Sequence, residues 1–162
     1  MNRKIAAGAA GGLIAGVALD IVMRLMHARD GGSMIAFGAH TVHASSAVAG
    51  WLAYLVYGVV IGAVFGWLLH TQTLDDLSSM VWGGLYGVGW WIVAGLVLIP
   101  ALQGAWPFSI SAVDQGREIA LPLLIGHVVY GVILGLAWSR ITNGTSLGQR
   151  PDTARIAPRR AA

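Results

Sequence analysis

Four residues with chemically active side chains lie within long apolar stretches of the sequence: Asp20, Arg24, Tyr54 and His127. An ionisable group inside the hydrocarbon of a membrane costs about 2.5 kcal/mol or more, so such groups are usually paired or functional. Histidine changes its charge near neutral pH, and a neighbouring carboxylate can shift its pKa across that range. One interpretation is therefore a small polar cavity for a proton, an ion or a small polar molecule.

A purely structural role for the same residues stays open. Asp20 and Arg24 are four residues apart, a spacing at which opposite charges pair on one helix face. His127 could hydrogen-bond to Tyr54 or to a backbone carbonyl and so hold two helices together.

The sequence offers little for metal or covalent chemistry. His40 and His43 would share a helix face and could supply two imidazoles, but no Glu or Cys accompanies them, so they are weak metal candidates. The sequence contains no cysteine, which excludes thiolate sites and disulfides. It also contains no Walker loop, HExxH or GxSxG motif. We predict no cofactor and do not expect an enzyme, although a haem- or metal-binding redox protein remains an alternative.

Composition indicates which elements must position these residues. The sequence is 56% hydrophobic and 10% charged, whereas soluble domains carry about 25% charged residues. A membrane-spanning helix needs roughly 20 mostly apolar residues. We predict an all-α integral membrane four-helix bundle over residues 1–141, with spans at about 5–26, 47–69, 80–102 and 119–138, followed by a disordered basic cytoplasmic tail at 142–162.

The basic residues predict the orientation of these spans. Most of them lie in the terminal segments: Arg3, Lys4, Arg140, Arg150, Arg155, Arg159 and Arg160. Lys and Arg accumulate on the cytoplasmic side of membrane proteins, so both termini are predicted to be cytoplasmic. This distribution is unlike a basic recognition face, and no nucleic-acid partner is expected. Five tryptophans near the predicted span ends are typical of the membrane interface: Trp51, Trp67, Trp82, Trp106 and Trp138.

Glycine predicts how the helices meet. Most of the 23 glycines lie inside the spans, where small residues let helix backbones approach closely. The predicted packing residues are Gly12, Gly16, Gly58, Gly62, Gly87, Gly131 and Gly135. Asp20 follows Gly16 by four residues, and His127 precedes Gly131 by four. The polar side chains therefore continue the glycine faces, and we expect them to gather in one layer roughly 9–12 Å below the outer boundary.

The two halves of the sequence resemble each other. The segment 56–62 (VYGVVIG) recurs as 129–135 (VYGVILG), and Gly11-Gly12-Leu13 recurs as Gly83-Gly84-Leu85. Two spans per unit predict duplicated helical hairpins in a parallel repeat, related by an axis along the membrane normal.

Several short motifs carry a family resemblance. They are residues 12–17 (GLIAGV), Tyr57-Gly58, residues 100–104 (PALQG) with Trp106-Pro107, and residues 126–131 (GHVVYG). The chain resembles the YagU-like small inner-membrane proteins of unassigned function. The resemblance implies a multi-pass helical protein of a bacterial inner membrane and supplies no catalytic residues.

Three functions remain open at this point. The first is a small transport or permeation element with an outward-facing polar cavity. The second is an accessory subunit that docks a larger membrane complex through its glycine faces. The third is the haem- or metal-binding redox protein. The expected partners are the lipid bilayer and either further copies of this chain or a larger membrane complex.

Overall fold

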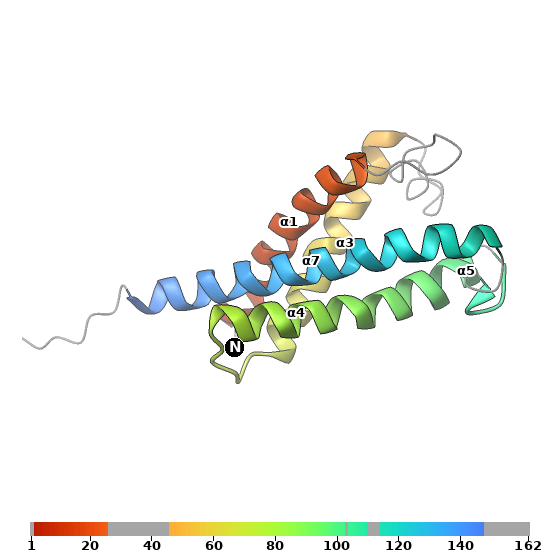
Figure 1. Cartoon of the computed structure of the whole chain (residues 1–162). Coiled ribbons are helices and arrows are strands. Elements are labelled where there is room, and N and C mark those ends of the chain that lie inside the picture. Colours follow the sequence, from red (N-terminus) through yellow and green to blue (C-terminus); the bar gives the residue numbers. More distant parts are fainter. Residues whose placement is uncertain (1, 26–45, 103, 110–113, 148–162) are drawn as a thin grey trace, which may run out of the picture.

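The computed structural model describes residues 2–25, 46–102, 104–109 and 114–147. Four long helices make up this part of the chain, which contains no strand. They are α1 (Asn2–Leu25), α3 (Ala47–Leu68), α4 (Asp76–Trp90) and α7 (Asp114–Leu147) (Figure 1). The third is extended by a π-helix, η1 (Trp91–Leu98), and by the short α5 (Ile99–Leu102). With α4 and η1 taken as one continuous helix, each of the four is long and apolar enough to cross a membrane. The predicted all-helical class and the four helices are confirmed.

The first two helices end close to their predicted bounds, whereas the last is longer than predicted at both ends. It begins at Asp114 and continues to Leu147, past the predicted end of the span at residue 138. The added C-terminal turns are polar, and hydropathy, which detects only apolar spans, does not predict them. They are held by side-chain hydrogen bonds, such as that from Thr142 Oγ1 to the Trp138 carbonyl (2.8 Å). Residues 148–162 of the predicted tail lie outside the described part.

Pro100 shapes the end of the third helix. Proline has no N–H, so the Leu96 carbonyl cannot receive an α-helical hydrogen bond from residue 100. Instead, the Phe108 amide donates to that carbonyl (2.6 Å), and the Ala105 amide donates to the Pro100 carbonyl (2.8 Å). Phe108 adopts a positive φ of 66°, which strains a residue with a side chain. The segment after the helix is thereby folded back onto η1.

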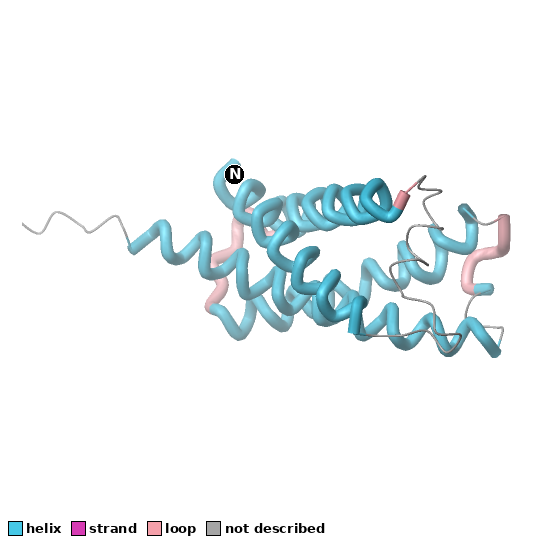
Figure 2. Tube along the Cα trace, turned by 90° about the horizontal axis from the view of Figure 1, so that it is seen from above, coloured by secondary structure: helices cyan, strands magenta, loops and turns pink. Residues whose placement is uncertain are grey.

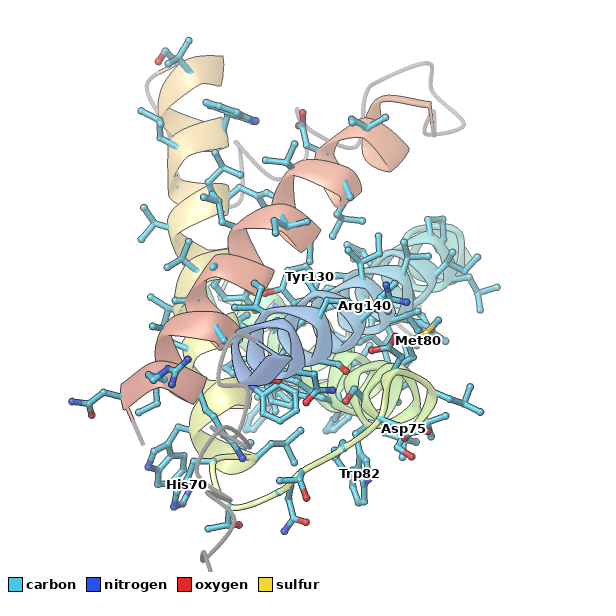
Figure 3. All side chains as sticks on the ribbon, turned by 90° about the vertical axis from the view of Figure 1, so that its left-hand side faces the viewer. His70, Asp75, Met80, Trp82, Tyr130 and Arg140 are labelled. Atoms are coloured by element: carbon cyan, nitrogen blue, oxygen red, sulfur yellow. The ribbon has the colours of Figure 1, made fainter. Side chains whose placement is uncertain are left out.

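The helices form two hairpins. The first hairpin consists of α1 and α3, and the second consists of α4, η1 and α7; α1 also packs on α7. In Figure 3 the helices α4 and α7 are viewed nearly end-on while α1 and α3 run across the view, so the hairpins cross instead of lying parallel. Figures 1 and 2 show the C-terminal turns of α7 projecting beyond the other helices.

Aromatic and aliphatic side chains fill the contact between the hairpins. Phe65, Leu134 and Trp138 are almost completely buried there. The interfacial position predicted for Trp138 is therefore wrong: its side chain is 1% exposed, and its indole Nε1 donates to the Lys4 carbonyl (3.1 Å). Because the ends of α1 and α7 pack against each other here, the Trp138 ring is buried between helices although it lies near the end of a predicted span.

Candidate functional site

Glycine brings the backbones of the first hairpin into direct contact. A Cβ atom on Gly12 would overlap the Gly58 carbonyl oxygen, and a Cβ atom on Gly62 would lie 2.7 Å from the Gly12 Cα. Gly8 faces Gly62 in the same way. Gly16 has more room, since its nearest neighbour, Leu55 Cδ2, is at an ordinary 3.5 Å.

The second hairpin is equally tight. A Cβ atom on Gly131 would overlap the Gly83 carbonyl oxygen, and one on Gly135 would overlap the Ser79 carbonyl oxygen. A Cβ atom on Gly87 would overlap the carbonyl oxygen of His127. No side chain larger than hydrogen fits at these positions without separating α4 from α7.

Contacts between the hairpins are made differently. At Gly11, where α1 faces α7, a Cβ atom would lie 3.2 Å from Leu134 Cδ1 and 3.3–3.4 Å from backbone atoms of Leu134 and Trp138, so these backbones are farther apart than those within a hairpin. Aromatic side chains supply the hydrogen bonds. The Tyr130 hydroxyl donates to the Gly58 carbonyl (2.6 Å), and the Tyr86 hydroxyl donates to the Ile61 carbonyl (2.7 Å).

These aromatic donors were not among the predicted site residues. The sequence signal for one of them was present, because Tyr57 and Tyr130 occupy the same position of the repeated segment. Tyr86, on α4, has no such signal. Its role depends on the crossing of the hairpins, which places its ring 5.2 Å from the Phe65 ring.

Two of the predicted polar residues are neighbours. Asp20 and Tyr54 are both partly buried and are close enough to interact electrostatically. They lie on α1 and α3, near the ends of these helices remote from the chain's N-terminus. Arg24 belongs to α1, but its side chain lies outside the described part. His40 and His43 also lie outside the described residues.

His127 has its contacts in the second hairpin. Its Nδ1 is 2.7 Å from the Leu123 carbonyl oxygen, which can only accept, so Nδ1 carries the proton. The lone pair is therefore on Nε2, which is the tautomer needed to accept a proton or to bind a ligand. The structure thus places Asp20 and Tyr54 together in the first hairpin, whereas the His127 ring contacts Leu123 of its own helix and only the His127 backbone carbonyl is shown facing α4, at Gly87. Tyr130, three residues after His127 on α7, reaches the first hairpin, where its hydroxyl donates to the Gly58 carbonyl and it is an electrostatic neighbour of Tyr54.

Three buried polar atoms have no hydrogen-bond partner in the described structure: Trp51 Nε1, Tyr57 Oη and Ser79 Oγ. Buried polar groups are almost always hydrogen-bonded, and an exception indicates a water, a ligand or strain. Trp51 and Tyr57 flank Tyr54 on α3, one turn away on either side. The interior near Asp20 and Tyr54 therefore offers two free hydrogen-bond donors.

The opposite end of the molecule is closed by polar contacts. Arg140 Nε lies 2.5 Å from Asp76 Oδ2, and the Ser139 hydroxyl donates to Asp76 Oδ1 (2.6 Å), which ties α4 to α7. The Lys4 ammonium donates to the Gln72 carbonyl in the turn after α3. Within the described residues, no group of three or more His, Cys, Asp or Glu side chains could hold a metal ion.

Comparison of the chain with protein-family models, with curated proteins and with solved structures finds no match. The resemblance to the YagU-like proteins therefore stays a prediction from short motifs. The fold and the side-chain geometry define a class: an all-helical protein of two glycine-packed hairpins with four helices suited to spanning a membrane.

Proposed function

We propose that this chain is a multi-pass protein of a bacterial inner membrane, with both termini in the cytoplasm, and that it is a small transport or permeation element. Its polar site contains Asp20, Tyr54 and His127, with Arg24 from the same turn of α1 as a further member. The species it carries is a proton or another small polar species.

The contrast between contacts within and between hairpins carries this proposal. Within each hairpin, backbones touch so closely that Gly62 and Gly131 admit no Cβ atom. Between hairpins the backbones are less closely apposed, since a Cβ atom on Gly11 would stay 3.2–3.4 Å from Leu134 and Trp138, and side chains such as Tyr130 donate the hydrogen bonds. Packed elements of this kind move as rigid bodies, and the contacts between them rearrange. A transporter needs that division into stiff units and a softer contact.

The two ends of the molecule support a direction of opening. At the end of the chain's N-terminus, the hairpins are joined by the hydrogen bond from the Trp138 indole to the Lys4 carbonyl (3.1 Å), and the Lys4 ammonium donates to the Gln72 carbonyl in the turn before α4. At the other end the crossing carries α1 and α3 away from α7 (Figures 1 and 3). Asp20 and Tyr54 lie toward that opposite end. A site that opens outward is the simplest use of this arrangement.

The lipid environment accounts for the surface. Large apolar side chains cover the outside of all four helices; Val56 and Leu85, for example, are 62% and 58% exposed. The candidate span within α7, Ala120–Gly144, has 25 residues and is about 38 Å long at 1.5 Å per residue, more than the roughly 30 Å of hydrocarbon. A helix longer than the hydrocarbon thickness tilts, which fits two hairpins that cross.

A gene duplication is part of the proposal. Gly12 meets Gly58 and Gly62 in the first hairpin, and Gly83 meets Gly131 and Gly135 in the second. The two glycine pairs on α3 and α7 occupy matching positions of the repeated sequence segment. A parallel repeat explains why both hairpins use the same backbone contact.

Proton flux into proteoliposomes tests the function. The full chain is reconstituted with a pH-sensitive dye inside, and a potassium diffusion potential drives protons inward. Wild type should acidify the lumen faster than empty vesicles. Asp20→Asn and His127→Ala should each slow acidification by about tenfold or more, because a carrier site must bind and release its proton. Asp75→Asn, at an exposed carboxylate on the tied end, is the matched control and should acidify like wild type.

Equal flux from wild type, Asp20→Asn and empty vesicles would rule out proton permeation. The same vesicles loaded with small neutral and charged solutes then test the wider class. If no solute leaves wild-type vesicles faster than empty ones, the transport proposal is wrong.

A further inference from the structure

A groove of about 370 Å³ lies between α3 and α4, near the end tied by polar contacts. Its lining is apolar or aromatic and comes from Phe65, Leu68, Leu69, Trp82, Leu85 and Tyr86. The volume falls in the range of small-ligand pockets, roughly 300–1,000 Å³. The groove bridges the two hairpins, because α3 belongs to the first and α4 to the second.

The chemistry of the lining selects a hydrocarbon ligand. The only side-chain hydroxyl in the lining belongs to Tyr86, and it already donates to the Ile61 carbonyl (2.7 Å). Trp82 contributes the only other polar side-chain atom, on a ring that is 53% exposed. The floor at Phe65 is 2% exposed, whereas the walls at Leu68 and Leu85 are more than half exposed. The groove is therefore deep at its centre and open along the outer surface of the helices.

Charges beside the groove select the headgroup. Leu69 lines the groove, and the turn that follows it receives the hydrogen bond from the Lys4 ammonium to the Gln72 carbonyl. Arg3 is adjacent on the first turn of α1 and is exposed. Lys4 makes no ion pair with a described residue; its ammonium lies over the Trp138 ring, 5.8 Å from the ring centroid, and keeps a net positive charge that attracts a phosphate. Figure 3 shows His70, which follows α3, and Trp82, which belongs to α4, near this turn.

Asp75 is the opposing charge at this end. Its carboxylate is exposed and accepts a hydrogen bond from the Ser78 amide (3.1 Å), which keeps it at the start of α4. Asp76 is neutralised by Arg140. Arg3 and Lys4 together therefore outweigh Asp75.

We propose that this groove binds one acyl chain of an anionic phospholipid from the cytoplasmic leaflet, with the headgroup at Lys4 and Arg3. The proposal rests on the membrane location given under the proposed function. A bound chain would touch both hairpins at once, at Leu68 and Leu85. The lipid would thereby act as a removable wedge at the contact between the two units.

Lipid retention tests the proposal directly. The full chain is placed in nanodiscs made from an equal mixture of phosphatidylglycerol and phosphatidylcholine, released in the mass spectrometer, and its bound lipids are counted. Wild type should retain phosphatidylglycerol in excess of phosphatidylcholine. Leu85→Trp fills the groove and should reduce retention by about tenfold, because the indole takes the space of the acyl chain and removes its packing contacts with both helices. Val81→Trp, on the same helix at a position that is 55% exposed and does not line the groove, is the matched control.

The headgroup has its own variant. Lys4→Gln should lower the preference for phosphatidylglycerol over phosphatidylcholine by about fivefold, the effect of one basic residue near an anionic surface. Circular dichroism establishes that each variant is folded. If Leu85→Trp does not fold, Leu68→Trp on the opposite wall, also about half exposed, replaces it.

Retention by Leu85→Trp equal to that of Val81→Trp would overturn the groove assignment. An unchanged preference in Lys4→Gln would overturn the headgroup assignment. Failure of wild type to retain phosphatidylglycerol in excess of phosphatidylcholine would overturn the lipid proposal, whereas failure of wild type to insert into the nanodisc would contradict the membrane location. Because retention is measured without a gradient or solute, a negative flux result leaves this test intact.

Discussion

Hydroxyl groups of two tyrosines that occupy the same position in the repeated segment have different surroundings. The Tyr130 hydroxyl donates to the Gly58 carbonyl of the other hairpin, whereas the Tyr57 hydroxyl is buried without a partner in the described structure. The two segments are therefore similar in sequence, but their tyrosine hydroxyls differ in hydrogen bonding. The difference arises because each tyrosine faces across the crossing of the hairpins, where the two sides are not alike.

Removing the two hydroxyls should have opposite consequences. Tyr130→Phe loses a hydrogen bond and should lower the free energy of unfolding by about 0.5–1.5 kcal/mol. Tyr57→Phe removes a buried group with no partner and should leave stability unchanged or raise it. Chemical denaturation of both variants in detergent, followed by circular dichroism, compares them. An equal loss in the two variants would show that Tyr57 is hydrogen-bonded in solution.

Glycine acts at the scale of the element, because it decides whether two helices can touch. On α4, a Cβ atom at Gly83 would overlap the Gly131 carbonyl oxygen, whereas one at Gly89 meets nothing within 4 Å. The two positions belong to the same helix and differ only in what they face. Alanine substitutions at these two positions therefore separate the effect of helix–helix packing from the effect of intrinsic helix propensity.

We expect Gly83→Ala to separate α4 from α7 and to destabilise the protein severely, since only backbone lies in the way. Gly89→Ala should be neutral or should stabilise the helix by up to about 1 kcal/mol, the propensity difference between the two residues. Thermal unfolding of both variants provides the measurement. Similar midpoints for the two would argue that α4 and α7 are not in backbone contact.

Asp75 begins α4 and gives the element a dependence on pH. Hydrogen bonds from the Ser78 side chain and the Ser78 amide hold the pKa of the Asp75 carboxyl below its ordinary value of 3.8. A carboxyl whose pKa is lowered by folding stabilises the folded state at pH values above its ordinary pKa. This contribution is lost as the pH falls through the folded-state pKa.

Asparagine is as good a helix N-cap as aspartate but does not titrate. Asp75→Asn should therefore match wild type near about pH 7 and lose less stability than wild type near about pH 3. Asp75→Ala should be less stable than both at the higher pH. Thermal midpoints at the two pH values decide this. Identical losses on acidification in wild type and Asp75→Asn would exclude Asp75 as the titrating group.

At the scale of the whole molecule, the proposed function requires the hairpins to move relative to each other. The absence of cysteine from the sequence makes this measurable, since introduced cysteines are the only labelling sites. Spin labels at Val17 and Leu121, which are 43% and 61% exposed, report the distance between hairpins. Labels at Val17 and Val56 report a distance within the first hairpin.

We expect a broad or two-peaked distance distribution between the hairpins and a single narrow one within the first hairpin. The physical reason is that glycine contacts lock α1 to α3, while side chains alone provide the hydrogen bonds between hairpins. Pulsed electron resonance in nanodiscs measures both. Two equally narrow distributions would show one rigid body and remove the basis for transport by rocking.

Orientation in the membrane is also a property of the whole chain. Reporter fusions after Gln149 should be cytoplasmic, and fusions near Ser33 or Ser111 should be periplasmic, because basic residues cluster at the termini. A cytoplasmic reporter at Ser111 would contradict the four-span topology.

The sequence by itself determined the helical class, the number of long apolar helices and most of their bounds. These depend on local composition, because a run of about 20 apolar residues forms a helix wherever the chain is placed in lipid. The polar turns at the end of α7 were missed for the same reason: side chains such as Thr142 and Asn143 support the helix through hydrogen bonds that hydropathy does not register.

Only the tertiary structure decided how the hairpins cross and, with that, which side chains share a site. Spacing alone put Asp20, Tyr54 and His127 at one depth; in the structure Asp20 and Tyr54 are electrostatic neighbours, whereas the hydrogen bond of the His127 ring is to Leu123 of its own helix. The same crossing buries Trp138 and hydrogen-bonds its indole to Lys4. Helix periodicity fixes which face a residue occupies, whereas the angle between two packed helices depends on the shapes of all the side chains between them. That information is spread over the whole core and is not contained in any single motif.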